Sequence, residues 1–298
     1  MTEITRSAAE RYAIVLPVGP GNIANTLDTI ASILYYSDER VTLFIVDDHT
    51  EDGTFEALSA LTDDRIVLLR GERSFGYRGL HATVAIALRA IVALGGFTLV
   101  FRIDWDALIT GPGVCEEAAT FFERNPHVGI CGRHLINYDG GSKTFDMHTR
   151  SMLERVGWPP RDDDREIGGI GWIANLALKN GWGLGENVFG GAFFIRTEAV
   201  ERMLELGFLD HIDNPDFWVI EDVFLTMCVL ATGFDRAHFA MPLAPLALAY
   251  GSLPAPAAEL YSRGMKVLHS VDKGRFTTAE ENDGVTPREF FRRIRESA

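Results

Sequence analysis

Two patterns of apolar positions alternate along the first hundred residues of the chain. Continuous apolar runs closed by glycine, proline or aspartate are typical of strands buried on both faces. Apolar side chains at every third or fourth position predict helices with one buried face. The predicted strands are residues 12–18, 41–46, 66–69 and 97–103, and the predicted helices are 22–36, 54–61 and 81–94. This alternation indicates an α/β fold with a mostly parallel central sheet flanked by helices.

The second half of the chain is less regular. Residues 137–187 are rich in glycine, aspartate, tryptophan and proline, which predicts long loops over a site. Residues 239–256 are proline-rich and predicted to be extended. Helices are predicted for residues 113–124, 198–206, 222–232 and 287–294, and a strand for 128–131.

The composition narrows the class of protein. With 28 basic and 42 acidic residues the net charge is −14, which disfavours nucleic acid and anionic membrane as partners. No uninterrupted apolar stretch is long enough to predict an integral membrane segment. Cys115, Cys131 and Cys228 form no C-x-x-C motif, so a cytoplasmic location is expected. A homo-oligomer is compatible with these features.

Several polar residues follow predicted strands, where α/β sheets bind ligands. Asp104 and Asp106 end a buried apolar strand, and two carboxylates at this spacing can offer hard oxygen ligands to Mg²⁺ or Mn²⁺ that holds a diphosphate. The pair Asp162/Asp164 has the same spacing but lies in an acidic loop, so context and not spacing separates them. The alternative for Asp104 and Asp106 is one carboxylate that caps the turn after the strand.

A second acidic pair, Glu221-Asp222, precedes a predicted helix and follows Phe217 and Trp218. A carboxylate beside an aromatic side chain suits a hydroxyl-bearing ring, because the ring stacks and the carboxylate takes a proton. The alternative is structural, since acidic residues are favourable at any helix N-terminus.

One motif favours a different chemistry. Residues 19–24 follow a predicted strand, open a helix and loosely match the dinucleotide fingerprint G-x-G-x-x-A. The acidic residues Asp47 and Asp48 lie about 25 residues further on, as in that fingerprint. The third glycine is absent, so an NAD(P)-dependent oxidoreductase is kept as an alternative.

The motifs together resemble family 2 of the inverting glycosyltransferases, on the GT-A fold with its Rossmann-like sheet. The segments that carry the resemblance occur in order over residues 11–235: Pro17 after the first strand, VDDHTEDGT at 46–54, DWD at 104–106, GGAFFIR at 190–196 and Glu221-Asp222. The sequence departs from the family pattern at residues 78–87, RGLHATVAIA, and the Q-x-x-R-W motif of processive polymerases is absent.

The resemblance implies a role for each motif. Asp222 would be the general base, and Asp106 would bind the metal ion with His269 as a late additional ligand; a surface or core histidine is the alternative for His269. The nucleotide-sugar would contact Pro17, Val18, Asp48, Arg78, Asp104 and Trp105. The acceptor would contact Gly191, Trp218 and Glu221.

The expected function is a metal-dependent transfer of a sugar from a nucleotide-sugar, with UDP favoured, to a hydroxyl of a soluble acceptor. A nucleotide-sugar-binding pseudoenzyme is a further alternative. The resemblance implies one GT-A domain over residues 1–298. Within it, the nucleotide-sugar half is 11–110, the smaller acceptor half 111–250, and a C-terminal extension 251–298.

Overall fold

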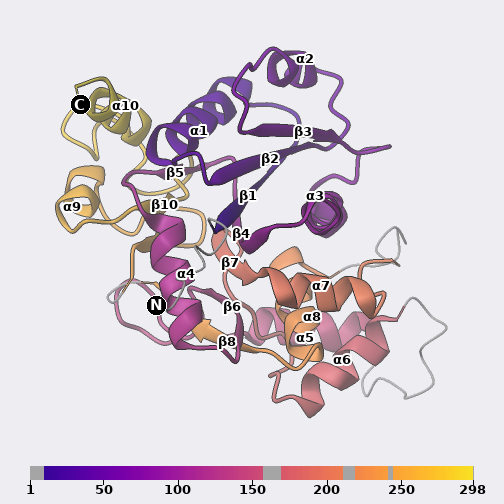
Figure 1. Ribbon diagram of the computed structural model, residues 1–298. Helices are drawn as coiled ribbons and strands as arrows, with labels where there is room; N and C mark the ends of the chain where they lie inside the picture. Colours follow the sequence, from indigo (N-terminus) through magenta and orange to yellow (C-terminus); the bar gives the residue numbers. More distant parts are fainter. Residues whose placement is uncertain (1–9, 157–168, 211–218, 241–243, 298) are drawn as a thin grey trace, which may run out of the picture.

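The computed structural model describes residues 10–156, 169–210, 219–240 and 244–297. A seven-stranded sheet runs through its centre in the order β3-β2-β1-β4-β7-β6-β8 (Figure 1). The strands are β1 (Arg11–Val18), β2 (Val41–Asp47), β3 (Ile66–Arg70), β4 (Phe97–Ile103), β6 (Val128–Gly132), β7 (Ala192–Arg196) and β8 (Asp235–His238). Strand β7 is antiparallel to both of its neighbours, and the other pairs are parallel.

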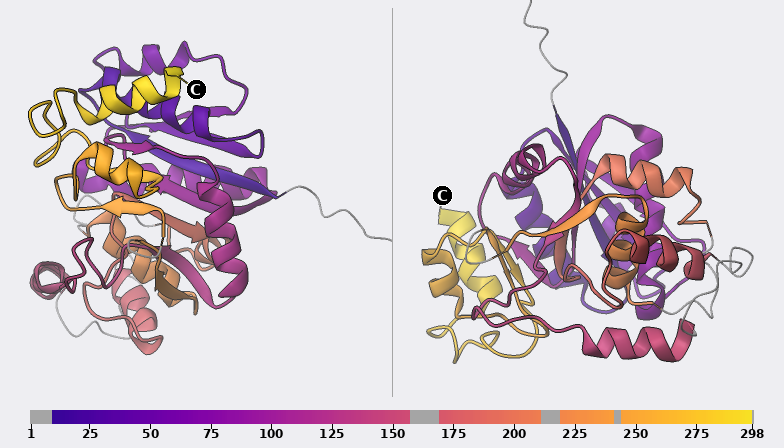
Figure 2. Two further views of the ribbon diagram at one scale, coloured as in Figure 1. Left: turned by 90° about the vertical axis from the view of Figure 1, so that its left-hand side faces the viewer. Right: turned by 90° about the horizontal axis from the view of Figure 1, so that it is seen from below.

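Helices cover both faces of the sheet. One face carries α1 (Ile23–Tyr36) and α4 (Val114–Arg124), and the other carries α3 (Leu80–Leu94), α7 (Thr197–Glu205) and α8 (Glu221–Ala231) (Figures 1 and 2). The remaining helices are α2 (Thr54–Ser59), a 3-10 turn η1 (Tyr77–Gly79), α5 (Asp146–Val156), α6 (Ile170–Lys179), α9 (Ala257–Ser262) and α10 (Pro287–Ser297).

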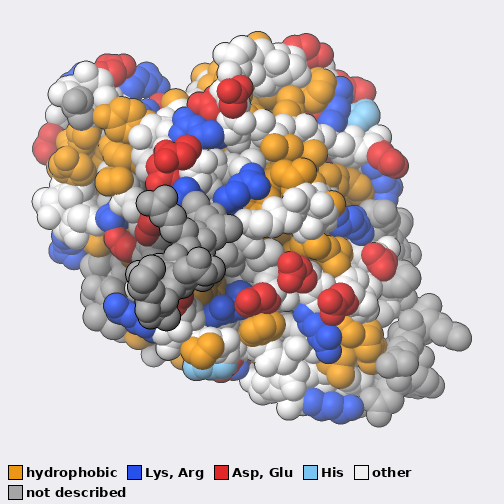
Figure 3. Space-filling model, in the orientation of Figure 1, with side chains coloured by type: hydrophobic (Ala, Val, Ile, Leu, Met, Phe, Trp, Pro, Cys, Tyr) orange, Lys and Arg blue, Asp and Glu red, His pale blue; other side chains and the backbone are white. Residues whose placement is uncertain are grey.

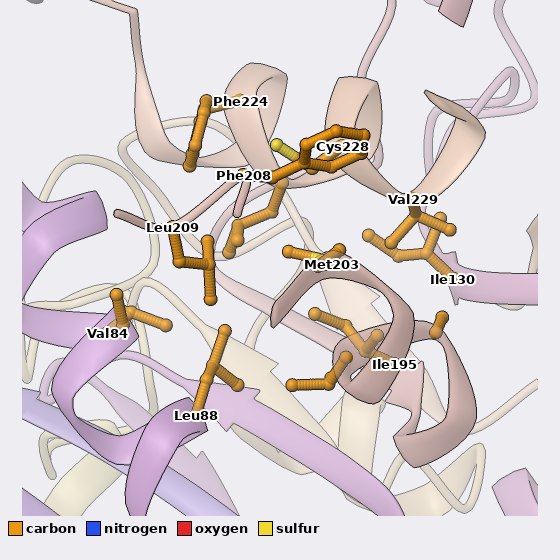
Figure 4. Packing of buried hydrophobic residues seen from close by; sticks show 14 of the residues in the cluster. Val84, Leu88, Ile130, Ile195, Met203, Phe208, Leu209, Phe224, Cys228 and Val229 are labelled. Atoms are coloured by element: carbon orange, nitrogen blue, oxygen red, sulfur yellow. The ribbon is translucent and has the colours of Figure 1, made fainter. Parts of the chain in front are cut away.

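Strands β1, β2 and β4 are mostly apolar because their successive side chains pack in different cores. In β1, Val15 packs in the core under α3, whereas Ile14 and Leu16 pack in the core under α1. Figure 4 shows part of the first core, where Leu88 of α3 lies near Met203 of α7 and Leu209 after it. This two-sided burial explains why continuous apolar runs predicted these strands correctly.

A smaller sheet joins the C-terminal part of the chain to the main sheet. It contains β5 (Ala107–Ile109), β10 (Val267–His269) and β9 (Leu246–Leu248), in that order. Strand β10 is antiparallel to β5, with His269 opposite Ala107. This pairing brings a residue near the end of the chain next to Asp106.

The prediction of long loops over residues 137–187 is wrong for two segments. Asp146–Val156 and Ile170–Lys179 form helices α5 and α6. Helix α6 packs against α8, and its Ile173, Ala174 and Ala177 are buried in the main core. That tertiary packing stabilises a helix whose flanking glycines and tryptophans favoured a loop at the level of sequence.

One segment among the described residues, Tyr77–Leu94, is long and apolar enough to cross a membrane by length and composition alone. It comprises η1 and α3, and α3 packs against β1, β2, α7 and α8. On the face shown in Figure 3, acidic and basic side chains are interspersed.

Candidate active site

Three potential metal ligands lie together at the junction of the two sheets. Asp104 follows β4, Asp106 precedes β5 and His269 ends β10. Each offers one ligand atom, and these atoms lie within 4.8 Å of one another. His269 Nε2 is 3.3 Å from Asp104 Oδ2 and 3.2 Å from Asp106 Oδ1. Neighbouring ligands of an octahedral ion with bonds of about 2.1 Å are separated by about 3.0 Å, so this donor set fits a hard divalent cation.

The carboxylate of Asp106 is held in a buried, positively charged environment. Its Oδ2 accepts a hydrogen bond of 2.6 Å from Ser270 Oγ and lies 3.2 Å from Lys273 Nζ. Burial alone would raise the pKa of Asp106, but His269, Ser270 and Lys273 hold it well below its usual range. Burial likewise acts to lower the pKa of His269, but the two carboxylates outweigh it and raise this pKa to about 9.

A second cluster surrounds Asp222 at the start of α8. Asp222 Oδ2 accepts hydrogen bonds from Asn187 Nδ2 and from the Gly190 amide, the latter at 3.0 Å. Its Oδ1 accepts one from the Val223 amide, at 2.8 Å. The Asn187 side chain is in turn held by Lys143, whose Nζ donates to Asn187 Oδ1 at 2.9 Å. Asp222 is therefore oriented by neighbours on both sides while Oδ1 keeps a lone pair for a further donor.

Arg102 joins the two clusters from inside β4. Its side chain is 1% exposed and forms ion pairs with Asp104 Oδ1 at 2.7 Å and with Glu221 Oε1 at 2.9 Å. It also donates to the Gly190 carbonyl. Burial raises the pKa of Glu221 to about 8, against the attraction of Arg102. Sequence reasoning missed Arg102, although a charged residue inside an apolar strand was a usable signal.

Gly190 and Gly191 pass between the clusters where side chains would not fit. A Cβ on Gly191 would lie 2.4 Å from His269 Nδ1, and a Cβ on Gly190 would lie 3.2 Å from Asp222 Cβ. The register explains their position, because Ala192 pairs with Ile103 and the two residues before it therefore run beside Asp104. The Asp104 amide donates to the Gly191 carbonyl at 3.1 Å.

On the donor side, Asp48 is already fully engaged. Its carboxylate accepts hydrogen bonds of 2.8–2.9 Å from Ser74 Oγ, Thr83 Oγ1 and the amides of Phe75 and Gly76. A carboxylate has about four acceptor sites, so a contact with a nucleotide base would displace one of these donors. In this structure Asp48 orders the loop that leads to η1 and Arg78.

The other residues predicted for the nucleotide-sugar lie around the same edge of the sheet. Pro17 and Val18 are buried at the end of β1, and Arg78 is exposed in η1. Trp105 stands between the two aspartates, with Lys273 Nζ 5.2 Å from its ring centroid. Trp218 lies outside the described residues. Lys143, Asn187, Ser270 and Lys273 were not predicted, because no motif or spacing connects them.

Comparison with known families decides what this arrangement belongs to. The family model described as "Glycosyl transferase family 2" matches residues 20–197, more than half of the chain. The chain belongs to glycosyl transferase family 2. Membership of a glycosyltransferase family with a GT-A fold is what the order of its motifs predicted. No curated protein matches the chain.

Solved structures similar to this glycosyltransferase include two proteins of low sequence identity. The mannosyltransferase PcManGT from Pyrobaculum calidifontis, in complex with GDP-Man and Mn²⁺, is 16% identical with a TM-score of 0.49. TarS 1-349 from S. aureus is 14% identical with a TM-score of 0.46. Each similarity covers 78% of this chain, which spans 55% and 59% of the two structures respectively.

Proposed function

We propose that this glycosyltransferase transfers a sugar from a UDP-sugar to a hydroxyl of a soluble acceptor, with inversion at the anomeric carbon. The observation that supports the proposal best is that two separate acidic groups flank one short segment, Gly190-Gly191. Asp104 and Asp106 lie on one side of it and Asp222 on the other. Such a pair of groups suits a single displacement, in which the leaving diphosphate and the incoming hydroxyl occupy opposite faces of the sugar.

The donor side is assigned to Asp104, Asp106 and His269, which would hold Mg²⁺ or Mn²⁺. When bound there, a divalent cation stabilises the negative charge of a departing diphosphate. Lys273, beside Asp106, adds a positive charge on the same side. Ser270 fixes the orientation of the Asp106 carboxylate through its hydrogen bond.

The acceptor side is assigned to Asp222 as general base. In this assignment the acceptor hydroxyl donates to Asp222 Oδ1, and the proton moves to that atom as the hydroxyl oxygen attacks the sugar. Asn187 and the Gly190 amide hold Oδ2, so the carboxylate cannot rotate away from the acceptor. The positions proposed to contact the acceptor are Gly191, Trp218 and Glu221.

The proposal is tested with purified protein, Mn²⁺ and a panel of UDP- and GDP-sugars. The expected result is release of UDP that increases when sugar alcohols or glycans are added as acceptors. The product of an α-linked donor should have a β-linkage by NMR. A GDP-sugar as the best donor would overturn the choice of UDP, and an α-linked product would overturn inversion.

Two further outcomes decide between the alternatives. Binding of UDP-sugar without hydrolysis or transfer to any acceptor would indicate a pseudoenzyme. Binding of NAD(P)H in place of UDP would indicate an oxidoreductase and would contradict the proposal.

A further inference from the structure

Two cations beside Asp222 have no acidic partner at ion-pair distance among the described residues. Arg133 follows β6 and is 7% exposed. Its Nη1 donates to the Leu248 carbonyl at 3.0 Å, and its guanidinium lies 4.0 Å from the Phe189 ring centroid. Its Nε is buried without a hydrogen-bond partner. Arg133 is thus held in place by a carbonyl and an aromatic ring, with donor capacity left unused.

Lys143 lies on the same side of the site. Its Nζ donates to the backbone and side-chain oxygens of Asn187, both at 2.9 Å. The same atom is 5.7 Å from the Phe189 ring centroid, so both cations face one aromatic ring. An ammonium group has three donors, and two of them are used here.

Other poorly exposed arginines of this protein have carboxylate partners. Arg102 is paired with Asp104 and Glu221, Arg236 with Glu186, and Arg288 with Asp28 and Asp272. Withdrawing a cation from water without such a partner costs free energy. Burial accordingly lowers the pKa of Lys143 to about 7 and that of Arg133 to about 10, despite the attraction of Asp222.

We propose that Arg133 and Lys143 bind an anionic group, a carboxylate or a phosphate, that one of the two substrates carries close to its reacting end. The inference rests on the proposed function, since it concerns the same site. Lys143 approaches Asp222 through Asn187. Arg133 lies over the Phe189 ring, whose centroid is 5.8 Å from that of the His269 ring. An anion bound there lies within the length of a sugar from the reacting groups.

The donor diphosphate does not account for this pair of cations. The diphosphate is assigned to the side of Asp106, where Lys273 already supplies a positive charge. The anion therefore belongs either to the acceptor or to the donor sugar, as in a uronic acid. An anion on either substrate presents the same chemistry to Arg133 and Lys143. A comparison of neutral and anionic acceptors, and of neutral and anionic donors, shows which substrate carries it.

The first test detects the anion without turnover. Lys143 is acetylated with acetic anhydride in the presence of EDTA, and its modification is followed by mass spectrometry. Inorganic phosphate, compared with chloride at equal ionic strength, is expected to slow modification of Lys143 but not of Lys266, which is paired with Glu117. Arg133→Gln should remove this protection. Equal rates of modification in phosphate and chloride would overturn the proposal.

The second test uses matched substrates that differ by one anionic group. The acceptor pair is a sugar and its 6-phosphate, and the donor pair is UDP-glucose and UDP-glucuronic acid. The anionic member of one pair is expected to be preferred about tenfold or more in kcat/KM, as for a hydrogen-bonded charge. Lys143→Gln and Arg133→Gln should abolish that preference, so kcat/KM should decrease more for the anionic member than for the neutral member.

Control variants separate the proposed role from indirect effects. Arg202→Gln removes an exposed arginine of α7 paired with Glu205 and should keep the preference. Arg133→Lys, which restores a charge, should recover part of it. Lys143 is only partly buried, so Lys143→Gln tests the proposal even if Arg133 variants unfold. An equal loss on neutral and anionic substrates would instead show that Lys143 acts only by orienting Asn187 and Asp222, and would overturn the proposal.

The two tests also distinguish this inference from the proposed function. Protection of Lys143 by phosphate without transfer of any sugar would leave the anion site standing and overturn the glycosyl transfer from UDP-sugars. If instead sugar is transferred from a UDP-sugar, but no anionic substrate is preferred and phosphate does not protect Lys143, the proposed function stands and the anion site is overturned.

Discussion

The two halves of the active site differ in the charged groups that converge in them. Around Asp104, Asp106 and His269 two carboxylates and an imidazole converge at distances that suit a divalent cation. Around Asp222 the cations Arg133 and Lys143 converge, and we propose above that they bind an anionic group.

Arg102 and the Gly190-Gly191 segment connect the two halves, and their hydrogen bonds and ion pairs are made within the protein. Arg102 is paired at both ends, and Gly190-Gly191 is hydrogen bonded to Asp222 on one side and to Asp104 on the other. Arg102 therefore needs no ligand to balance its charge, whereas Arg133 and Lys143 have no carboxylate at ion-pair distance among the described residues. Perturbing one half at a time should therefore give separable effects.

The largest effect is expected from removing the metal-binding half. Asp106→Ala deletes a carboxylate that the three-ligand group requires, so metal-dependent nucleotide binding and sugar transfer should both be lost. Chelation of divalent cations should have the same effect on the unmodified protein. Calorimetry with UDP and Mn²⁺ checks binding, and Asp63→Ala, at a surface pair with Arg65, serves as control. Full activity in the presence of chelator would contradict the assignment of Asp104, Asp106 and His269 as metal ligands.

The base-side half is broken by Asp222→Asn, which keeps the shape of the side chain and removes its basicity. Turnover should decrease by about 10²–10⁴, the range typical of a general base, while UDP affinity stays nearly unchanged. Steady-state kinetics and UDP titration measure the two effects. Near-normal turnover in Asp222→Asn, with the loss found instead in Glu221→Gln, would show that another carboxylate is the base.

Substitutions of Gly190 and Gly191 should separate the effects on metal binding from those on turnover. In Gly191→Ala the new Cβ would displace the His269 ring, and metal affinity should decrease by about 10–100-fold, as for other disturbed ligand positions. In Gly190→Ala the Cβ approaches Asp222 instead, so turnover should decrease while metal affinity is retained. Mn²⁺ titrations of both variants are the measurement. The same loss of metal affinity in both would argue that the two halves are not independent.

The smallest expected effect is on stability, and it concerns Glu186, the carboxylate partner of Arg236. Glu186 accepts from His134 at 2.7 Å and is paired with Arg236 at 2.9 Å. Burial alone would raise the pKa of Glu186, but these partners and the Gly183 amide lower it to about 2. Glu186→Gln should reduce the free energy of unfolding at pH 7 by about 1–3 kcal/mol.

The pH dependence of that effect has a definite sign. A carboxyl whose folded pKa is depressed contributes stability above its unfolded pKa of 4.5, and this contribution is lost as the pH falls toward 2. The difference in unfolding free energy between wild type and Glu186→Gln should therefore shrink between pH 4.5 and 2. Urea unfolding at several pH values measures it, and a constant difference would contradict the assigned cause.

The sequence predicted the donor-side half well because its signals are local. Strands β1, β2 and β4 are buried on both faces, β3 is partly buried, and the helices have an apolar side, so composition and periodicity coincide with the structure. Asp104 and Asp106 could be singled out because they end such a strand. The Glu221-Asp222 pair was found for a similar reason, since a helix begins directly at Glu221.

The acceptor-side half could not be predicted to the same extent because its contacts are long-range. Arg133, Lys143 and Asn187 are far apart in the sequence, and Arg133 and Lys143 contact the same Phe189 ring only in the folded chain. Strands β5, β9 and β10 have three residues each, too few for a periodic pattern. Helix α6 depends on packing against α8, which no local pattern reveals.

The antiparallel strand β7 affects how this enzyme can change during evolution. The chain leaves the sheet after Gly132 and returns at Ala192, and Gly132 pairs with Phe193 in the adjacent strand. Both ends of the intervening segment are thus anchored side by side, so its length can vary at little cost in loop-closure entropy. Arg133, Lys143 and Asn187 all belong to this segment. Under the proposed function, insertions or deletions in this segment outside α6 would alter the acceptor side while Asp104, Asp106 and His269 keep their positions.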